Sequence, residues 1–230
     1  MPVPLAPAAL APVALVLVAL GLFALITWQV VAGGPLVGVD ERVSRELVRP
    51  DGFSEFLSDL GNVEVAVPVL ALAAGWAARR ARRAGAVRWW VPATAALALM
   101  ALVPLVVVPV KMLTDRPGTP VVPPATGYFP SGHTTTALVA YGCAVLLLLP
   151  WTRPASARRA LVPVGAAAVL GVSYGLVRRG YHWPLDVVAG WCLGVVLLTV
   201  FVRVVAGWGP VTGSSCRSSA GTPSSRTGPS

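Results

Sequence analysis

Residues 89–110 read WWVPATAALALMALVPLVVVPV, a stretch that contains no charged side chain. A membrane-spanning helix needs about 20 apolar residues, because the hydrocarbon core is about 30 Å thick and each helical residue rises about 1.5 Å. This stretch therefore predicts a helix that crosses a membrane.

Five more apolar runs flank this stretch, at residues 8–32, 63–78, 134–149, 161–177 and 187–205. Of the 230 residues, 56% are hydrophobic and 12% are charged, which is about half the charged fraction of a soluble domain. The composition excludes a water-exposed globule and a separate soluble domain. We therefore predict an all-α bundle of six transmembrane helices over residues 1–205. A disordered tail rich in Ser, Thr and Gly is expected at 206–230.

The basic residues indicate topology rather than a nucleic-acid partner. The net charge is +9, but the arginines lie in short groups between apolar runs, notably at 79–88 and 153–159. Short cytoplasmic loops collect Arg and Lys, so these two connections and both termini are predicted to be cytoplasmic. The other three connections then face outward. The Arg-rich, nearly Lys-free composition favours a bacterial plasma membrane.

The outward connection at residues 34–60 is acidic on balance and has helical spacing of apolar residues on both sides of a break at 50–52. Val43 and Leu47 lie before the break, and Phe53, Phe56 and Leu57 lie after it. Two interpretations stay open. We favour a helix lying passively at the membrane interface over a flap that covers a site.

A short polar motif, Pro130-Ser131-Gly132-His133, opens the fourth predicted span. Ser131 is a competent helix N-cap, and the free N–H groups of a helix start bind anions. Gly132 would let an anion approach the backbone closely. Ordinary capping would explain Ser131 and Gly132, but His133 directly after them favours a functional site.

A second motif precedes the sixth predicted span and contains His182 and Asp186. Residues four apart share one face of a helix, so the carboxylate is placed to orient the imidazole, as in the His–Asp part of a catalytic triad. A helix cap with a surface ion pair is the alternative interpretation.

The third element is Lys111, the single lysine of the sequence, followed by Arg116. A lone lysine at a span end usually extends to the lipid headgroups. However, the connections at 111–133 and 175–186 together hold the only Lys and both His residues. Cations, helix-start amides and two imidazoles suit a phosphate ester. The cysteines form no metal-binding pair, and we expect neither a metal nor a cofactor.

These motifs resemble the type 2 phosphatidic acid phosphatase superfamily of integral-membrane lipid phosphatases. The family pattern is Lys-x6-Arg-Pro, then Pro-Ser-Gly-His, then Ser-Arg-x5-His-x3-Asp, and the sequence has the second part in full and the His-x3-Asp of the third. The resemblance implies a metal-independent phosphohistidine mechanism. In it, His182 attacks phosphorus, Asp186 holds that ring, and His133 protonates the leaving lipid alkoxide. The residues implied to bind the phosphate are Lys111, Arg116, Ser131 and Gly132.

The sequence departs from the family pattern at its arginines. Arg116 follows Lys111 by five positions instead of seven, which on a continuous helix turns it about 140° away. Arg116 reaches the site only if the helix has ended, which the following proline favours. The Ser-Arg positions of the third motif hold Gly175 and Leu176. Arg178 and Arg179 are available substitutes, and we favour Arg179.

We therefore predict a phosphatase of a lipid phosphate or diphosphate that acts at the outer membrane face. Three alternatives stay open: a phosphotransferase that uses the same site, a degenerate lipid-phosphate-binding protein, and a structural or transport bundle without catalysis.

Overall fold

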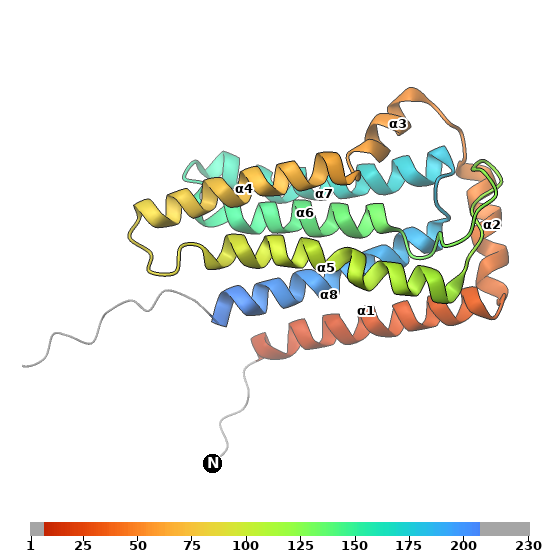
Figure 1. The fold of residues 1–230 in the computed structure, drawn as a ribbon, viewed down its shortest axis with the longest axis horizontal. Coiled ribbons are helices and arrows are strands. Elements are labelled where there is room, and N and C mark those ends of the chain that lie inside the picture. Colours follow the sequence, from red (N-terminus) through yellow and green to blue (C-terminus); the bar gives the residue numbers. More distant parts are fainter. Residues whose placement is uncertain (1–6, 208–230) are drawn as a thin grey trace, which may run out of the picture.

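The computed structural model describes residues 7–207 and, within them, contains helices and no strands (Figure 1). The helices are α1 (Pro7–Val31), α2 (Pro35–Leu47), α3 (Gly52–Asp59), α4 (Val63–Arg83), α5 (Val91–Thr114), α6 (Gly132–Leu148), a 3-10 turn η1 (Leu149–Trp151), α7 (Ala155–Arg179) and α8 (Pro184–Gly207).

The long helices coincide with the six predicted apolar runs, which confirms the all-α bundle. Helices α1, α5, α6, α7 and α8 are long and apolar enough to cross a membrane. Helix α4, with four arginines at its end, qualifies only together with α3, to which it is joined at a bend of 49°. Helix α8 continues to Gly207, two residues beyond the predicted end of the domain. The rest of the predicted tail, residues 208–230, lies outside the described residues.

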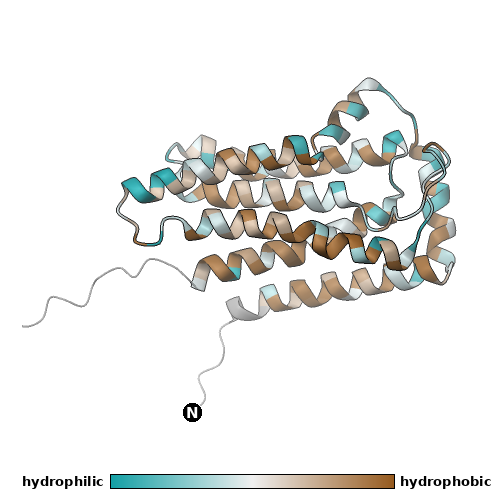
Figure 2. Cartoon of the chain, viewed as in Figure 1, coloured by the Kyte–Doolittle hydropathy of each residue, from teal (hydrophilic) through white to brown (hydrophobic). Residues whose placement is uncertain are grey.

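The outer surface of the bundle is apolar along most of its length. Figure 2 shows hydrophobic residues along the long helices and hydrophilic residues gathered toward the two ends. Leu17, Leu72 and Leu105 expose 64%, 75% and 70% of their surface. Soluble monomers rarely expose such continuous apolar area, so this belt suits the hydrocarbon of a bilayer.

The two ends of the bundle differ in what they carry. The arginine-rich connections α4–α5 and α6–α7 lie at the same end as the start of α1 and the finish of α8 (Figure 1). The connections α5–α6 and α7–α8, which hold the candidate site residues, lie at the opposite end with α2 and α3. The arginine-rich connections thus lie together at one end of the bundle, as the positive-inside rule requires. That the arginine-rich end is cytoplasmic stays a prediction.

Helix α6 is the central helix and packs against α4, α5, α7 and α8. Its buried face includes Ala137, Ala140 and Ala144. Small side chains let helix backbones approach closely in a membrane, where close packing rather than the hydrophobic effect drives helix association. This packing places the first turn of α6, with Ser131 at its N-cap, at the centre of the bundle end.

Helices α2 and α3 each turn two small or acidic polar residues toward the bundle, while most of their apolar residues and the other charged residues of α2 are exposed. Asp40 and Ser44 of α2 and Ser54 and Ser58 of α3 are buried. The aromatic residues of α3 point outward, with Phe53 66% exposed. This arrangement is typical of helices that lie at a membrane interface while their polar side chains cover the end of the bundle. The helix break predicted at 50–52 is confirmed. That the segment lies passively at the interface stays a prediction.

Helix α3 lies directly on α7 because α7 has glycine at the contact. A Cβ atom added to Gly175 would lie 2.6 Å from the backbone oxygen of Ser54 and 2.6 Å from the backbone nitrogen of Ser58. Backbone atoms cannot rotate away, so only glycine allows this approach. The serine that the family pattern has at this position is therefore incompatible with the observed α3 position.

We expect Gly175→Ala to lower the stability of the protein by about 1–3 kcal/mol, because overpacking forces the backbone of α3 away from α7. Gly171→Ala is the matched control on the same helix, since its added Cβ would meet only the flexible side chain of Leu57, at 3.2 Å. Thermal unfolding in detergent measures the difference. Equal midpoints for the two variants would show that α3 is not held by this contact.

Candidate active site

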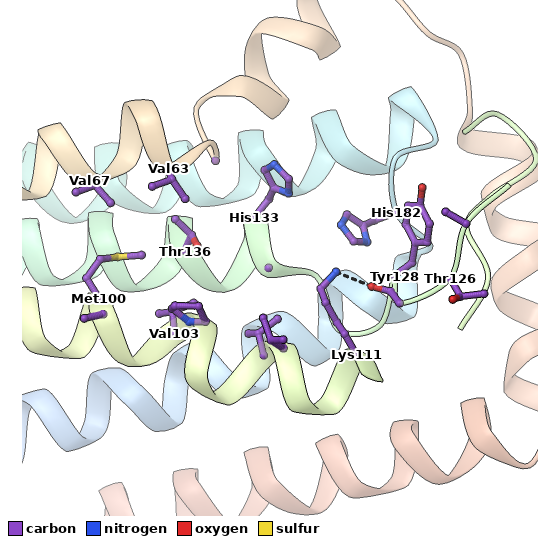
Figure 3. Close-up of a pocket in the computed structure, with 18 of the residues that line it drawn as sticks. Val63, Val67, Met100, Val103, Lys111, Thr126, Tyr128, His133, Thr136 and His182 are labelled. Carbon is purple, nitrogen blue, oxygen red and sulfur yellow. Dashed lines mark hydrogen bonds between the residues drawn. The ribbon is translucent and has the colours of Figure 1, made fainter. Parts of the chain in front are cut away.

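The polar motifs predicted from the sequence converge at one end of the bundle, on three different elements. Lys111 comes from the last turn of α5, His133 from the first turn of α6, and His182 from the connection between α7 and α8. Figure 3 shows these three side chains directed toward a common space. The ring centroids of His133 and His182 are 6.2 Å apart, and the ring planes are inclined by 62°.

His182 is buried and held by a carboxylate from the first turn of α8. Its Nδ1 lies 3.2 Å from Oδ2 of Asp186, and the same oxygen accepts a hydrogen bond from the backbone N–H of Trp183 at 3.2 Å. Asp186 is fully buried. An ionised carboxylate only accepts hydrogen bonds, so Nδ1 of His182 carries the proton. Nε2 is left with its lone pair for the cavity, which His182 lines.

Asp186 is itself held by Arg116, which reaches the site because α5 ends before it. The helix stops at Thr114, and the next residue, Asp115, has a left-handed backbone with φ 45°. Arg116 donates from one terminal nitrogen to Asp186 Oδ1 at 2.6 Å and from the other to Asp40 Oδ2 at 2.6 Å. Arg116 is only 5% exposed. Its guanidinium therefore supports the His182–Asp186 pair from behind and does not line the cavity.

Asp40 connects helix α2 to this network. Its Oδ1 accepts a hydrogen bond from the backbone N–H of Leu185 at 2.9 Å, next to Asp186. Burial raises the pKa of the Asp40 carboxyl above its ordinary value, although Arg116 and the Leu185 N–H oppose this effect. The α2 helix is thus part of the support of the site.

The residues of the predicted phosphate-binding motif at the start of α6 have two different roles, one in the fold and one at the cavity. The Ser131 hydroxyl caps α6 by accepting from the backbone N–H of Thr134 at 3.3 Å, and Ser131 is fully buried. Its backbone N–H donates to the carbonyl of Asp186 at 2.9 Å, which joins the starts of α6 and α8. Gly132 and His133 line the cavity. The serine side chain is therefore used in the fold, while the backbone of the next residue faces the cavity.

Lys111 lies at the polar end of a cavity of about 760 Å³. Its ammonium group donates to the carbonyl of Gly127 at 2.8 Å. From this end the cavity runs between α4 and α5, where it is lined by apolar side chains such as Val67, Met100 and Val103 (Figure 3). Four cations were predicted for the site. Within the described residues Lys111 lines the cavity, whereas Arg116, Arg178 and Arg179 do not.

The two arginines at the end of α7 pair with carboxylates of the α3 segment. Arg178 Nε lies 3.0 Å from Asp51 Oδ2, and Arg179 Nε lies 2.5 Å from Glu55 Oε2. Two hydrogen bonds to the Asp51 carboxyl lower its pKa to about 2. The larger effect comes from the backbone N–H of Ser54 and the smaller from the side chain of Arg178. Neither arginine lines the cavity.

The position that holds the family arginine is part of the core in this structure. Leu176 is 1% exposed, and its carbonyl accepts hydrogen bonds from the backbone N–H groups of Tyr181 and His182. The leucine side chain adds no charge to the site, but its backbone helps to hold the loop that carries His182.

Sequence reasoning missed two residues that contact His133 and His182. Asn62 is hydrogen-bonded to His133 and also to Asp59. Tyr128 packs edge-on against His182, with ring centroids 5.9 Å apart. Asn62 is the single asparagine of the sequence, and this rarity at the start of a predicted span was a signal for it.

Within residues 7–207, the structure has no group of three or more His, Cys, Asp or Glu side chains placed to hold a metal ion.

Two known proteins and one family model are similar to this chain. Over 83 residues, the chain is 41% identical to an undecaprenyl-diphosphatase of Sulfolobus acidocaldarius, and the match covers 36% of each chain. The chain therefore spans about a third of the length of that relative.

The fold is similar to the crystal structure of a transmembrane PAP2 type phosphatidylglycerolphosphate phosphatase from Bacillus subtilis. The TM-score is 0.68 and the identity is 22%, with 85% of this chain and 96% of that chain covered. The model of the PAP2 superfamily matches residues 92–210, more than half of the chain and all of the motif residues from Lys111 to Asp186. The chain belongs to the PAP2 superfamily.

Proposed function

We propose that the protein is a membrane-embedded phosphatase that releases phosphate from a lipid phosphate or diphosphate through a phosphohistidine on His182. The observation that carries the proposal is the placement of two histidine rings, 6.2 Å apart, at the polar end of a cavity that is otherwise apolar. A substrate with a phosphate head and a hydrocarbon tail matches both ends.

In the first step, the lone pair of His182 Nε2 attacks phosphorus, and the bond between phosphorus and the lipid oxygen breaks. The leaving oxygen takes a proton from His133. Asp186 stabilises the positive charge that develops on the His182 ring, as the carboxylate of a triad does. In the second step, water attacks phosphorus and gives a proton to His133. The nitrogen–phosphorus bond breaks, which releases phosphate and restores His182.

The lipid chain is proposed to lie between α4 and α5. The cavity continues from the histidines along Val67, Met100 and Val103 into the apolar belt of the bundle. The substrate of one named relative is a prenyl diphosphate, and that of the other is a phosphatidylglycerol phosphate. Both substrates have this two-part chemistry, so both belong in the test, beside phosphatidate. We place the active end at the extracytoplasmic face of the plasma membrane, opposite the arginine-rich connections.

The test is phosphate release by the purified protein in detergent, with a chelator present, from these three lipids. Lys111→Met is expected to lower kcat/KM by about 10- to 100-fold, because the variant removes the ammonium group at the polar end of the cavity. Arg158→Met is the matched control, since Arg158 is an exposed cation in the first turn of α7, and α7 starts at the opposite end of the bundle (Figure 1). Failure of the parent protein to release phosphate from any lipid would refute the proposal.

A second candidate function is a lipid-phosphate-binding protein without turnover. It is favoured by the pairing of Arg116, Arg178 and Arg179 with carboxylates, which leaves Lys111 as the predicted cation that lines the cavity. This candidate predicts saturable binding of a lipid phosphate without phosphate release and without a phosphoenzyme. Transfer of the phosphoryl group to an added alcohol would instead indicate the phosphotransferase alternative.

A further inference from the structure

We propose that Asn62, held by Asp59, is a positioning residue that sets which nitrogen of His133 faces the substrate. The proposal rests on the phosphatase function above, in which His133 acts as the general acid. It assigns a role to the corner between α3 and α4, which none of the motifs includes.

The two hydrogen bonds of the Asn62 side chain are consistent with only one orientation of its amide group. Asn62 Nδ2 donates to Asp59 Oδ1 at 3.0 Å, and Asn62 Oδ1 lies 2.9 Å from His133 Nε2. A carboxylate accepts but does not donate, so the NH₂ group of Asn62 must face Asp59. The amide oxygen must then face His133.

This orientation determines the state of the His133 ring. An amide oxygen accepts hydrogen bonds, so Nε2 of His133 carries a proton. When the His133 ring is doubly protonated, Nδ1 is the nitrogen left to donate a proton to the leaving oxygen of the substrate, after which the ring is neutral and keeps its proton on Nε2. Because Asn62 is the N-cap residue of α4 and Asp59 is the last residue of α3, the ring is held by the bend between these helices.

The side chain of Asn62 is not needed for the helix that it precedes. Asn62 occupies the N-cap position of α4, but no hydrogen bond from its side chain caps that helix. Asparagine is a strongly preferred capping residue, and here its polar group is directed to His133 instead. This use supports a role in positioning rather than in helix stability.

The two histidines have partners that suit two different tasks. His182 contacts the Asp186 carboxylate directly, and a negative partner stabilises the positive charge that the nucleophile acquires. His133 contacts a neutral amide, which orients the ring without holding its proton as tightly as a carboxylate would. A general acid must release its proton in the transition state, so the neutral partner suits His133.

The decisive experiment compares two lipid-like substrates with the same chain, dodecyl phosphate and 4-dodecylphenyl phosphate. An alkoxide needs a proton to leave, whereas a phenoxide is a much better leaving group and depends less on a general acid. For Asn62→Leu, which keeps the size of the side chain but accepts no hydrogen bond, kcat with the alkyl ester is expected to fall about 10- to 100-fold. With the aryl ester it is expected to fall less than about 3-fold, and KM is expected to stay unchanged for both.

A rescue variant separates this role from a structural one. Asp59→Asn combined with Asn62→Asp exchanges the two groups, so that residue 59 donates to residue 62 and an oxygen of residue 62 still accepts from His133. We expect this double variant to recover part of the alkyl-ester activity that Asn62→Leu loses, because the carboxylate at residue 62 orients the His133 ring again but holds its proton more tightly than the amide does. Thermal unfolding in detergent checks that both variants remain folded.

The outcomes are distinguishable. If the parent releases no phosphate from either ester, the phosphatase function itself fails. If the parent is active and Asn62→Leu matches it with the alkyl ester, the positioning role is wrong. An equal loss with both esters would also overturn it, because that result would indicate a general disturbance of the site.

Discussion

Replacing His182 with alanine is expected to abolish phosphate release, with kcat lowered by roughly 10⁴-fold or more. The reason is that the variant removes the atom proposed to form the bond to phosphorus. His182 is also positioned by Asp186 and buried, so no neighbouring side chain can replace Nε2 in line with the substrate. Phosphate release from a lipid phosphate measures the effect.

The same variant tests the covalent intermediate. The parent protein, mixed with a ³²P-labelled lipid phosphate and quenched with alkali, is expected to carry label on histidine, whereas His182→Ala is expected to carry none. The chain has two histidines, which makes His133→Ala the natural control. With an aryl phosphate, whose leaving group needs less protonation, His133→Ala should still become labelled. Label that persists in His182→Ala would contradict the assignment of the nucleophile.

Replacing Arg116 with alanine is expected to destabilise the protein by about 3–5 kcal/mol and to lower its activity as well. The variant leaves Asp40 and Asp186 without the guanidinium that bonds to both at 2.6 Å, and an unpaired buried carboxylate is costly. Thermal or chemical unfolding in detergent measures the stability, and steady-state kinetics measure kcat and KM separately.

This prediction distinguishes two roles for Arg116. A phosphate-binding arginine, as the family resemblance implies, predicts a raised KM with little change in stability. A supporting arginine predicts a loss of stability and of kcat, because Asp186 no longer holds the His182 ring. The structure favours the supporting role.

A second substitution checks the cause of the lost stability. Asp40→Asn removes one of the two carboxylates, so adding it to Arg116→Ala should cost less than the sum of the single variants. Strict additivity would show that Asp40 and Arg116 do not share one network.

The helices were predictable from the sequence because each apolar run acts locally. A run such as 89–110 becomes a helix in a membrane regardless of its neighbours, since every backbone N–H and C=O must be paired within the segment. The same reasoning places Lys111, His133 and His182 at one end, because successive spans must alternate in direction. These residues did converge in the structure.

The arginines were less predictable. The ending of α5 before Arg116 was anticipated from the following proline, but its partner Asp40 lies 76 positions away in the chain. Arg178 and Arg179 were expected near the phosphate, yet they contact Asp51 and Glu55 instead. No local pattern encodes these pairs, because they depend on where α2 and α3 dock.

By itself, the sequence determined the class of the protein, its long helices, the two histidines with Asp186, and the family. These features follow from short-range patterns, namely hydrophobic run length and the spacing of polar residues within a turn. Only the tertiary structure decided which carboxylate each arginine meets, that α3 rests on Gly175, and that Asn62 contacts His133. The physical reason is that such contacts join side chains from helices far apart in the chain, and their partners are chosen by how closely those helices pack.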